Sequence, residues 1–297
     1  MTYLTEWSFD PFVIVAAVVI AWHEVGLRRL ARRSRPTRNA ERRRRSLLFY
    51  AGILLLLVTV TSPIDYWADD YFFVHMIEHL MLMFFAPMLI VAGAPWLPLV
   101  HALPVGVRRQ VGRAVLLGAW ARPLRAAGRF LTSGWVAVVI FNVVMVFWHV
   151  PAPFDLAERN TTIHIWLMHG SFFASGVFFW LQIHSSYPFR PRLSTLGRAG
   201  ALIVTNVVMW VLAMALSLFS TGSWYSVYNH IPGVTLSPYA DQLIGAAVLW
   251  VCGDFWCLPV LIRVIHQAAS EEGSPSALID RVLRRPALSP SGRLPDV

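Results

Sequence analysis

The sequence predicts an all-α bundle of about seven helices that span a membrane, and two observations support this fold class. The first is composition: of 297 residues, 57% are hydrophobic and 14% are charged, with a mean hydropathy of +0.56. Soluble domains are about 45–50% apolar and about 25% charged. The second is the presence of several long apolar runs, because a spanning helix needs about 20 mostly apolar residues. An ordinary soluble domain is excluded, and the formal charge of +9 does not point to a nucleic-acid partner.

Seven apolar runs, each bounded by charge, Pro or Gly, are the predicted spans. In chain order they cover residues 12–25, 47–61, 72–92, 135–149, 163–183, 199–219 and 239–262. Residues 1–266 are therefore expected to form one membrane domain, and residues 267–297, rich in Ser, Pro and Arg, a flexible cytoplasmic tail. Residues 94–133 mix prolines and arginines with Leu, Val and Trp. This mixture suggests a basic amphipathic segment at the membrane interface, although a plain basic loop has the same composition.

Arginine placement predicts the orientation, because basic residues near span ends stay on the cytoplasmic side. All 25 basic residues are arginine. They gather on alternating connections, with ten at 28–45, six at 94–133, three at 190–198 and five from 263 onwards, and only Arg159 lies on the opposite side. We therefore expect the N-terminus outside and the C-terminus in the cytoplasm.

Six of the ten histidines lie near the outer ends of the predicted spans, at positions 75, 79, 149, 164, 169 and 230. The other four, at positions 23, 101, 184 and 266, fall on the cytoplasmic side among arginines. Polar residues also cross-link membrane helices without binding anything. The shared depth of the six nevertheless favours a metal site over a purely structural polar layer.

The segment His75-Met76-Ile77-Glu78-His79 carries the clearest metal-ligand pattern. With 3.6 residues per turn, His75, Glu78 and His79 share one helix face, and Met83 continues it one turn further in. Imidazoles above a thioether suit copper, since His binds copper and zinc while Met favours Cu(I). An ionisable glutamate is costly inside a span, so Glu78 is a candidate functional residue.

The other candidate ligands are spread over three spans. His164 is five residues from His169, so on a regular helix the second is expected to point away and not to share one tight site. His149 precedes Pro151 and Pro153, so its span is expected to end there with the imidazole free to turn to the outer side. Asp241 is a candidate ligand or an acceptor that orients an imidazole.

The last span carries a deeper polar group. Asp254 lies between Cys252 and Cys257, and an intramembrane carboxylate is normally functional or paired. Asn142 and Asn206 are candidate hydrogen-bond partners. The cysteines are either thiolate ligands or small buried side chains, and no disulfide is expected from them.

The chain resembles the multi-spanning CtaG family of cytochrome c oxidase assembly factors in four stretches, HMIEHLML from residue 75, FWHVPAPFD from residue 147, residues 164–169, and DQLIGAAVLWVCGD from residue 241. The resemblance covers roughly residues 10–265, without the arginine-rich loop, residues 94–133 or the tail. It implies a bacterial plasma-membrane protein that matures a haem-copper oxidase by handling copper at the outer face. The residues it carries over are His75, Glu78, His79, His149, His164, His169, Asp241 and Asp254.

The expected partners are therefore cytochrome c oxidase subunits, a periplasmic copper chaperone and membrane lipid. No enzyme activity is expected, since the copper would be exchanged between partners. Two other function classes stay open. The HMIEH segment matches the HxxEH pattern of zinc proteases, with Glu78 as general base beside two ligands. His79 with His164 or His169 also suits axial ligation of haem.

Overall fold

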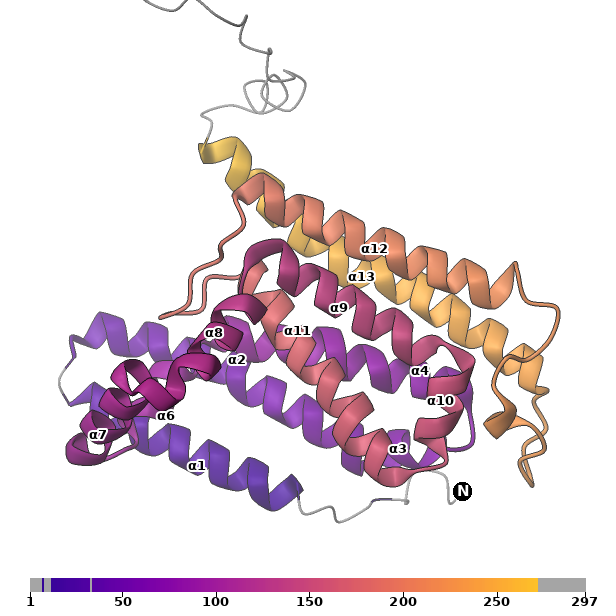
Figure 1. The fold of residues 1–297 in the computed structure, drawn as a ribbon, viewed down its shortest axis with the longest axis horizontal. Coiled ribbons are helices and arrows are strands. Elements are labelled where there is room, and N and C mark those ends of the chain that lie inside the picture. The colour runs from indigo at the N-terminus through magenta and orange to yellow at the C-terminus, as the bar shows by residue number, and fades with distance from the viewer. Residues whose placement is uncertain (1–6, 8–11, 33, 272–297) are drawn as a thin grey trace, which may run out of the picture.

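The computed structural model describes residues 7, 12–32 and 34–271, which fold into helices joined by loops (Figure 1). The predicted all-α fold is confirmed. The elements are α1 (Phe12–Ala31), α2 (Pro36–Thr61), α3 (Pro63–Ala68), α4 (Phe72–Leu80), η1 (Met81–Phe85), α5 (Ala86–Gly93), α6 (Trp96–His101), α7 (Val105–Leu117), η2 (Ala119–Ala121), α8 (Arg122–Leu131), α9 (Gly134–His149), α10 (Pro151–Glu158), η3 (Ile163–His169), α11 (Gly170–Ile183), α12 (Thr195–Ser217), η4 (Ser226–Tyr228) and α13 (Pro238–Glu271).

Four helices in the described part of the chain are long and apolar enough to cross a membrane. They are Pro36–Thr61, Phe72–Gly93, Thr195–Ser217 and Pro238–Ser270, and a fifth span exists if Ala119–Leu131 and Gly134–His149, which meet at 81°, count as one. The other predicted spans, in α1 and in η3 with α11, are helical but are not among these. The molecule is thus a multi-pass helical membrane protein, while the number seven and the orientation stay predictions.

The continuous helix of α4, η1 and α5 lies at the centre of the molecule. It packs against α2, α11 and α13, and it is the most buried of the four candidate spans. Two glycines permit the close approach of its neighbours. A Cβ at Gly245 of α13 would lie 2.6 Å from the Phe72 ring, and one at Gly176 of α11 would lie 2.3 Å from the Met83 carbonyl oxygen. The helix that carries His75 and His79 is therefore held on both sides.

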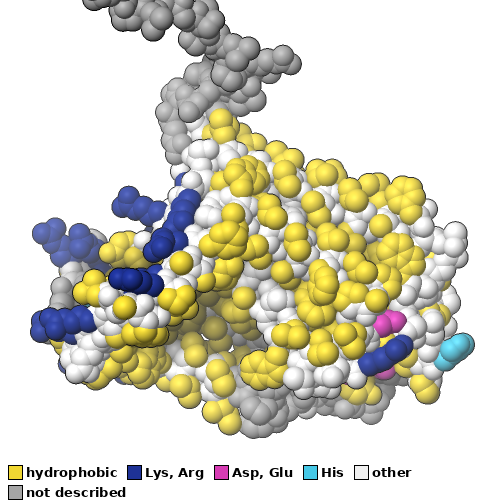
Figure 2. All heavy atoms as spheres, in the orientation of Figure 1, with side chains coloured by type: hydrophobic (Ala, Val, Ile, Leu, Met, Phe, Trp, Pro, Cys, Tyr) yellow, Lys and Arg dark blue, Asp and Glu magenta, His cyan; other side chains and the backbone are white. Residues whose placement is uncertain are grey.

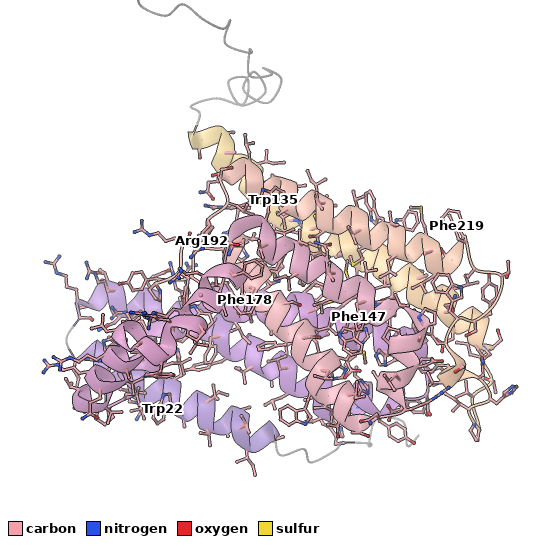
Figure 3. The ribbon with its side chains drawn as sticks, viewed as in Figure 1. Trp22, Trp135, Phe147, Phe178, Arg192 and Phe219 are labelled. Atoms are coloured by element: carbon pink, nitrogen blue, oxygen red, sulfur yellow. The ribbon has the colours of Figure 1, made fainter. Side chains whose placement is uncertain are left out.

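The surface of the molecule is apolar along its length and basic at one end. Exposed aromatic side chains such as Trp22, Phe147 and Phe219 project outward from the helices (Figure 3), as expected of surface that contacts lipid. Most of the arginines visible in Figure 2 gather at the end formed by the start of α2 and by α6 to α8. The molecule therefore has two distinct ends, of which one is rich in arginine and the other in histidine.

Two predicted regions take a defined form. Residues 94–133 are largely helical, as α6, α7, η2 and α8, so they are not an irregular loop, and their place at a membrane interface stays a prediction. Helix α13 runs to Glu271, so the first residues of the predicted flexible tail are helical because the last span continues through them. The rest of that tail, 272–297, lies outside the described residues.

Candidate metal centre

The first pair of histidines stands on the regular helix α4. Residues four apart lie on one helix face, and the Nε2 atoms of His75 and His79 are 2.6 Å apart. Both side chains are fully buried, and Glu78 beside them is 1% exposed. The i, i+4 spacing therefore brings two potential ligand atoms together in the interior.

The second pair stands on η3, which is a π-helical segment. The expectation that His164 and His169 point in different directions is wrong, because their Nε2 atoms lie 2.7 Å apart. A π-helix closes hydrogen bonds from residue i to residue i+5, so side chains five residues apart share a face. The α-helical period was the wrong one for this segment.

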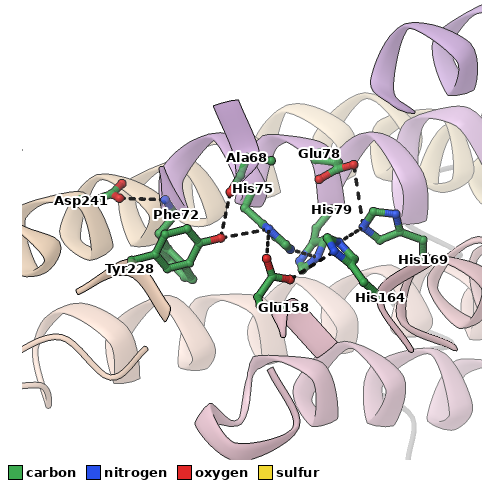
Figure 4. A network of polar contacts seen from close by, with 10 residues as sticks. All are labelled: Ala68, Phe72, His75, Glu78, His79, Glu158, His164, His169, Tyr228 and Asp241. Atoms are coloured by element: carbon green, nitrogen blue, oxygen red, sulfur yellow. Dashed lines mark hydrogen bonds and ion pairs between the residues drawn. The ribbon is translucent and has the colours of Figure 1, made fainter. Parts of the chain in front are cut away.

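The two pairs form one cluster (Figure 4). The rings of His75 and His164 are stacked with their centroids 5.3 Å apart. Glu78 Oε1 lies 3.8 Å from Nε2 of His169. One ligand atom from each of His75, Glu78, His164 and His169 lies within 4.8 Å of all the others. These distances describe a single centre built by α4 and η3.

Two further residues belong to this cluster, and sequence reasoning missed both. Glu158, at the end of α10, lies between the pairs, with Oε2 3.6 Å from Nδ1 of His75 and Oε1 3.5 Å from Nδ1 of His164. The hydroxyl of Tyr228 is 3.0 Å from Nδ1 of His75 and donates to the carbonyl of Ala68. Glu158 lies only three residues after the FWHVPAPFD stretch, on the helix α10 that begins within it, and this proximity was a signal for Glu158. Tyr228 ends the three-residue 3-10 turn η4 in the connection between α12 and α13, which is too short for a periodicity to indicate its neighbours.

The contacts of Tyr228 fix which nitrogen of His75 carries a proton. A tyrosine hydroxyl has a single proton, and this one is donated to Ala68, so its oxygen accepts from the Nδ1–H of His75. Nε2 of His75 is then unprotonated. Metal-ligating histidines are oriented in this way, with the second ring nitrogen donating to an acceptor outside the metal site. Oε1 of Glu158 faces Nδ1 of His164 at 3.5 Å, without a hydrogen bond between them.

His149 closes α9 as the sequence predicts, but its imidazole does not turn to an open outer side. The side chain is 1% exposed, and its Nδ1 bonds the carbonyl of Met145 at 2.6 Å. A carbonyl only accepts, so Nδ1 carries the proton and Nε2 is unprotonated. The ring centroid lies 5.4 Å from that of His79, which places a fifth imidazole at the edge of the cluster.

Several buried polar atoms of the cluster have no hydrogen-bond partner. They are both carboxylate oxygens of Glu78, Nδ1 of His79, Nε2 of His149 and Oε1 of Glu158. Buried polar groups are normally satisfied. Burial, with the charges of Asp69 and Asp155, also raises the pKa of Glu158 to about 9. A cation would satisfy these lone pairs, and imidazoles with a carboxylate are suitable ligands for copper or zinc. The residues therefore fit a transition-metal ion.

The remaining predicted site residues lie around this centre. Asp241 accepts hydrogen bonds from the backbone N–H groups of Phe72 and Phe73, at 2.7 and 2.9 Å, so its carboxylate caps the start of α4. Met83 lies in η1 and is part of the hydrophobic core. Asp254 accepts a hydrogen bond from Asn206 at 3.2 Å, one of its two candidate partners.

The other histidines and the cysteines have separate surroundings. His230 is exposed, in the connection before α13. His23 is buried on α1, where its Nδ1 lies 3.0 Å from the hydroxyl of Tyr50. Cys252 and Cys257 are free thiols, and Cys257 is buried beside the carbonyl of Leu202. Of the six histidines expected at the outer end, five gather at the centre and His230 does not.

A family model described as cytochrome c oxidase caa3 assembly factor (Caa3_CtaG) matches residues 21–271. The chain belongs to this family. The match includes every residue of the metal centre, and the resemblance found in the sequence is confirmed. It also extends across the arginine-rich loop and residues 94–133, which the motifs alone did not reach.

The Caa3_CtaG chain is also similar to curated proteins that are themselves uncharacterized. One from Mycobacterium bovis and one from Mycobacterium tuberculosis are each 28% identical to it over 282 residues, and one from Mycobacterium leprae is 24% identical. Each alignment covers 94% of this chain and 42% of the relative, so the chain spans less than half the length of these proteins. No solved structure matches it.

Proposed function

We propose that this Caa3_CtaG protein binds copper at the His/Glu centre and passes it to a haem-copper cytochrome c oxidase during assembly. The observation that carries the proposal is the cluster of five imidazoles, four of them buried, with the carboxyl groups of Glu78 and Glu158. The family name supplies the link to the oxidase. The protein itself then needs no catalytic residue, because the metal is cargo that enters and leaves unchanged.

The donor set favours copper among the available divalent metals. Sites made of nitrogen and oxygen ligands bind Cu²⁺ more tightly than Zn²⁺ or Fe²⁺. Nε2 of His75 and Nε2 of His149 are unprotonated for the reasons given above, so binding there releases no proton from these two atoms. Glu158, with its pKa raised to about 9, is protonated at neutral pH in the absence of metal. A divalent cation would displace that proton, and the carboxylates of Glu78 and Glu158 would then offset its charge.

The position of the centre agrees with transfer at the outer face. The centre lies at the end of the bundle away from the arginines, and the positive-inside rule assigns the arginine end to the cytoplasm. A copper chaperone of the periplasm and the oxidase subunits that receive copper would both reach the protein from that side of a bacterial plasma membrane. These are the partners that we propose.

The two other function classes have less support. The four rings of the two pairs contact one another, with Nε2 atoms 2.6 and 2.7 Å apart, so a porphyrin has no slot between them. A zinc protease needs access for a polypeptide, whereas His75, Glu78 and His79 are at most 1% exposed. In addition, Glu78 Oε1 lies 3.8 Å from Nε2 of His169. This position suits a metal ligand better than a general base.

The test is oxidase maturation in cells that lack the chromosomal gene and carry plasmid-borne variants. We expect His75→Ala with His79→Ala to leave the oxidase copper-deficient and to abolish oxygen consumption from a cytochrome c-linked donor. His23→Ala removes a buried histidine outside the centre and is the matched control. Glu78→Gln should lower oxidase activity more than it lowers the amount of this protein in an immunoblot. Full, copper-replete oxidase activity in the deletion cells at limiting copper would refute the proposal.

A further inference from the structure

The arginine-rich end of the molecule contains a cavity of about 690 Å³ that is separate from the metal centre. Its walls come from three places in the chain: the first turns of α2, the corner between α5 and α6, and the loop after α11. The lining residues on α2 include Arg38, Glu41, Arg42 and Arg45, and the opposite wall includes Ala94, Leu97, Pro98 and Tyr187. One wall is therefore cationic and the other is mostly apolar.

The cationic wall carries positive charge that its own acidic residue does not neutralise. Glu41 is paired with Arg45 and with Arg44, at 2.8 and 3.2 Å. Arg42 donates one N–H to Ser34 at 2.7 Å. A guanidinium has five N–H donors, so Arg42 retains others. Arg38 is exposed at the same wall. The three arginines and one glutamate that line this wall therefore leave it with a net charge of +2.

The apolar wall is fixed by a tight turn. Helix α5 ends at Gly93, where a Cβ would lie 2.6 Å from the backbone nitrogen of Phe49, so α2 and α5 touch there. Ala94 then adopts a left-handed conformation, with φ of 47°, which turns the chain sharply into α6. This geometry makes a concave surface. By contrast, helix α7, which carries Arg108, Arg109 and Arg113, has no buried residue.

We propose that this cavity binds the headgroup of an anionic phospholipid, with its phosphate on Arg38 and Arg42. Guanidinium groups are well suited to phosphate oxygens, and basic pockets between membrane helices bind anionic headgroups. The same arginines would also attract free phosphate. A lipid is the better fit because the wall opposite the arginines is apolar and presents Leu97, which is half-buried, and Tyr187, which is 60% exposed. Acyl chains can lie along these side chains.

The experiment measures lipid binding to the delipidated full-length protein in detergent, by native mass spectrometry during titration with phosphatidylglycerol or phosphatidylcholine. We expect Arg38→Gln with Arg42→Gln to weaken phosphatidylglycerol binding about 30-fold, at about fivefold for each arginine. Arg108→Gln with Arg109→Gln removes the same charge from α7 and should bind like the wild type. Phosphatidylcholine should bind weakly to all three proteins.

Each alternative has its own outcome. Equal loss in the α7 variant would mean diffuse attraction to the basic end and would overturn the proposal. Displacement of phosphatidylglycerol by millimolar inorganic phosphate, with phosphate retained on the protein, would assign the cavity to free phosphate and would overturn the lipid assignment. The single variant Arg38→Gln, at an exposed position, provides the same test if the double variant does not fold. Unchanged copper content of all variants separates this site from the metal centre.

Discussion

The His75/His79 pair and the His164/His169 pair reach almost the same contact through different backbones. The Nε2 atoms are 2.6 Å apart in the first pair and 2.7 Å apart in the second. The first pair uses the i, i+4 spacing of a regular helix, and the second uses the i, i+5 spacing of a π-helix. The comparison teaches that a ligand pair is defined by the local helical period and not by one fixed spacing.

The two pairs also differ in how firmly the surrounding structure holds the segments that carry them. The first is fully buried on the central helix, and the Asp241 carboxylate of α13 caps the start of that helix. The second is partly accessible, since His164 is only partly buried and Leu167 is exposed. Its segment starts with a local contact, in which Asn160 accepts from the N–H of Ile163 at 3.1 Å. We expect the first pair to be the rigid half of the centre and the second the half that opens for exchange.

The largest expected effect comes from removing the cap of the first pair. Asp241→Ala leaves the buried N–H group of Phe72 and the partly buried N–H group of Phe73 without their charged acceptor. This loss should cost about 3 kcal/mol of unfolding free energy. Asn160→Ala removes the exposed contact of the second pair and should cost about 1 kcal/mol or less. The measurement is reversible unfolding in mixed detergent micelles. An equal loss of unfolding free energy in the two variants would contradict the inference that the first histidine pair is held more firmly than the second.

The next effect concerns the carboxylate shared by the pairs. Glu158→Gln weakens the acceptor that faces Nδ1 of both His75 and His164, and loss of such a contact typically lowers metal affinity about 10- to 100-fold. Asp155→Asn, on the same helix, is the control, because Asp155 accepts from the N–H of Ser226. Copper affinity is measured by competition with a chelator of known affinity. A decrease of similar size in the control would show that the effect is not specific to Glu158.

A smaller effect is expected at the hydroxyl that bonds only the first pair. Tyr228→Phe removes the acceptor for the Nδ1–H of His75, and one hydrogen bond is worth about 1 kcal/mol, or about fivefold in copper affinity. Tyr225→Phe is the matched variant, since the hydroxyl of Tyr225 bonds the backbone carbonyl of His149 at 2.8 Å. We expect Tyr225→Phe to lower stability alone. Unchanged affinity in Tyr228→Phe would contradict the proposed tautomer.

The smallest expected effect tests the π-helix itself. Deleting the exposed Leu167 brings His164 and His169 to the i, i+4 spacing, and a regular helix keeps residues four apart on one face. Copper affinity should therefore stay within about twofold of the wild type. Deleting Met76 and Ile77 from the regular helix α4 leaves the two histidines only two residues apart, on opposite sides of the helix, and should abolish binding. Loss of copper binding on deletion of Leu167 would mean that the π-helical segment is needed for more than bringing His164 and His169 together.

The comparison also explains how far the sequence could be interpreted. The all-α fold, the paired His75 and His79 and the end of α9 at His149 follow from composition, helical period and Pro151, which are local properties. The pairing of His164 with His169 could not be derived, because the period of a π-helix is not visible in residue types. Tyr228 and the cap formed by Asp241 depend on which helices pack together. Such contacts join residues more than 150 positions apart, beyond the range of any periodicity.

The measurement that tests the central claim most directly is the copper-to-protein ratio of the purified protein. It is determined for the wild type, for His75→Ala with His79→Ala, and for His164→Ala with His169→Ala, after loading with copper and removal of free metal. A single centre built by both pairs predicts about one copper per chain in the wild type and almost none in either double variant. Two independent sites would leave each variant with half of the wild-type copper, and an unchanged ratio in both variants would contradict the metal centre altogether.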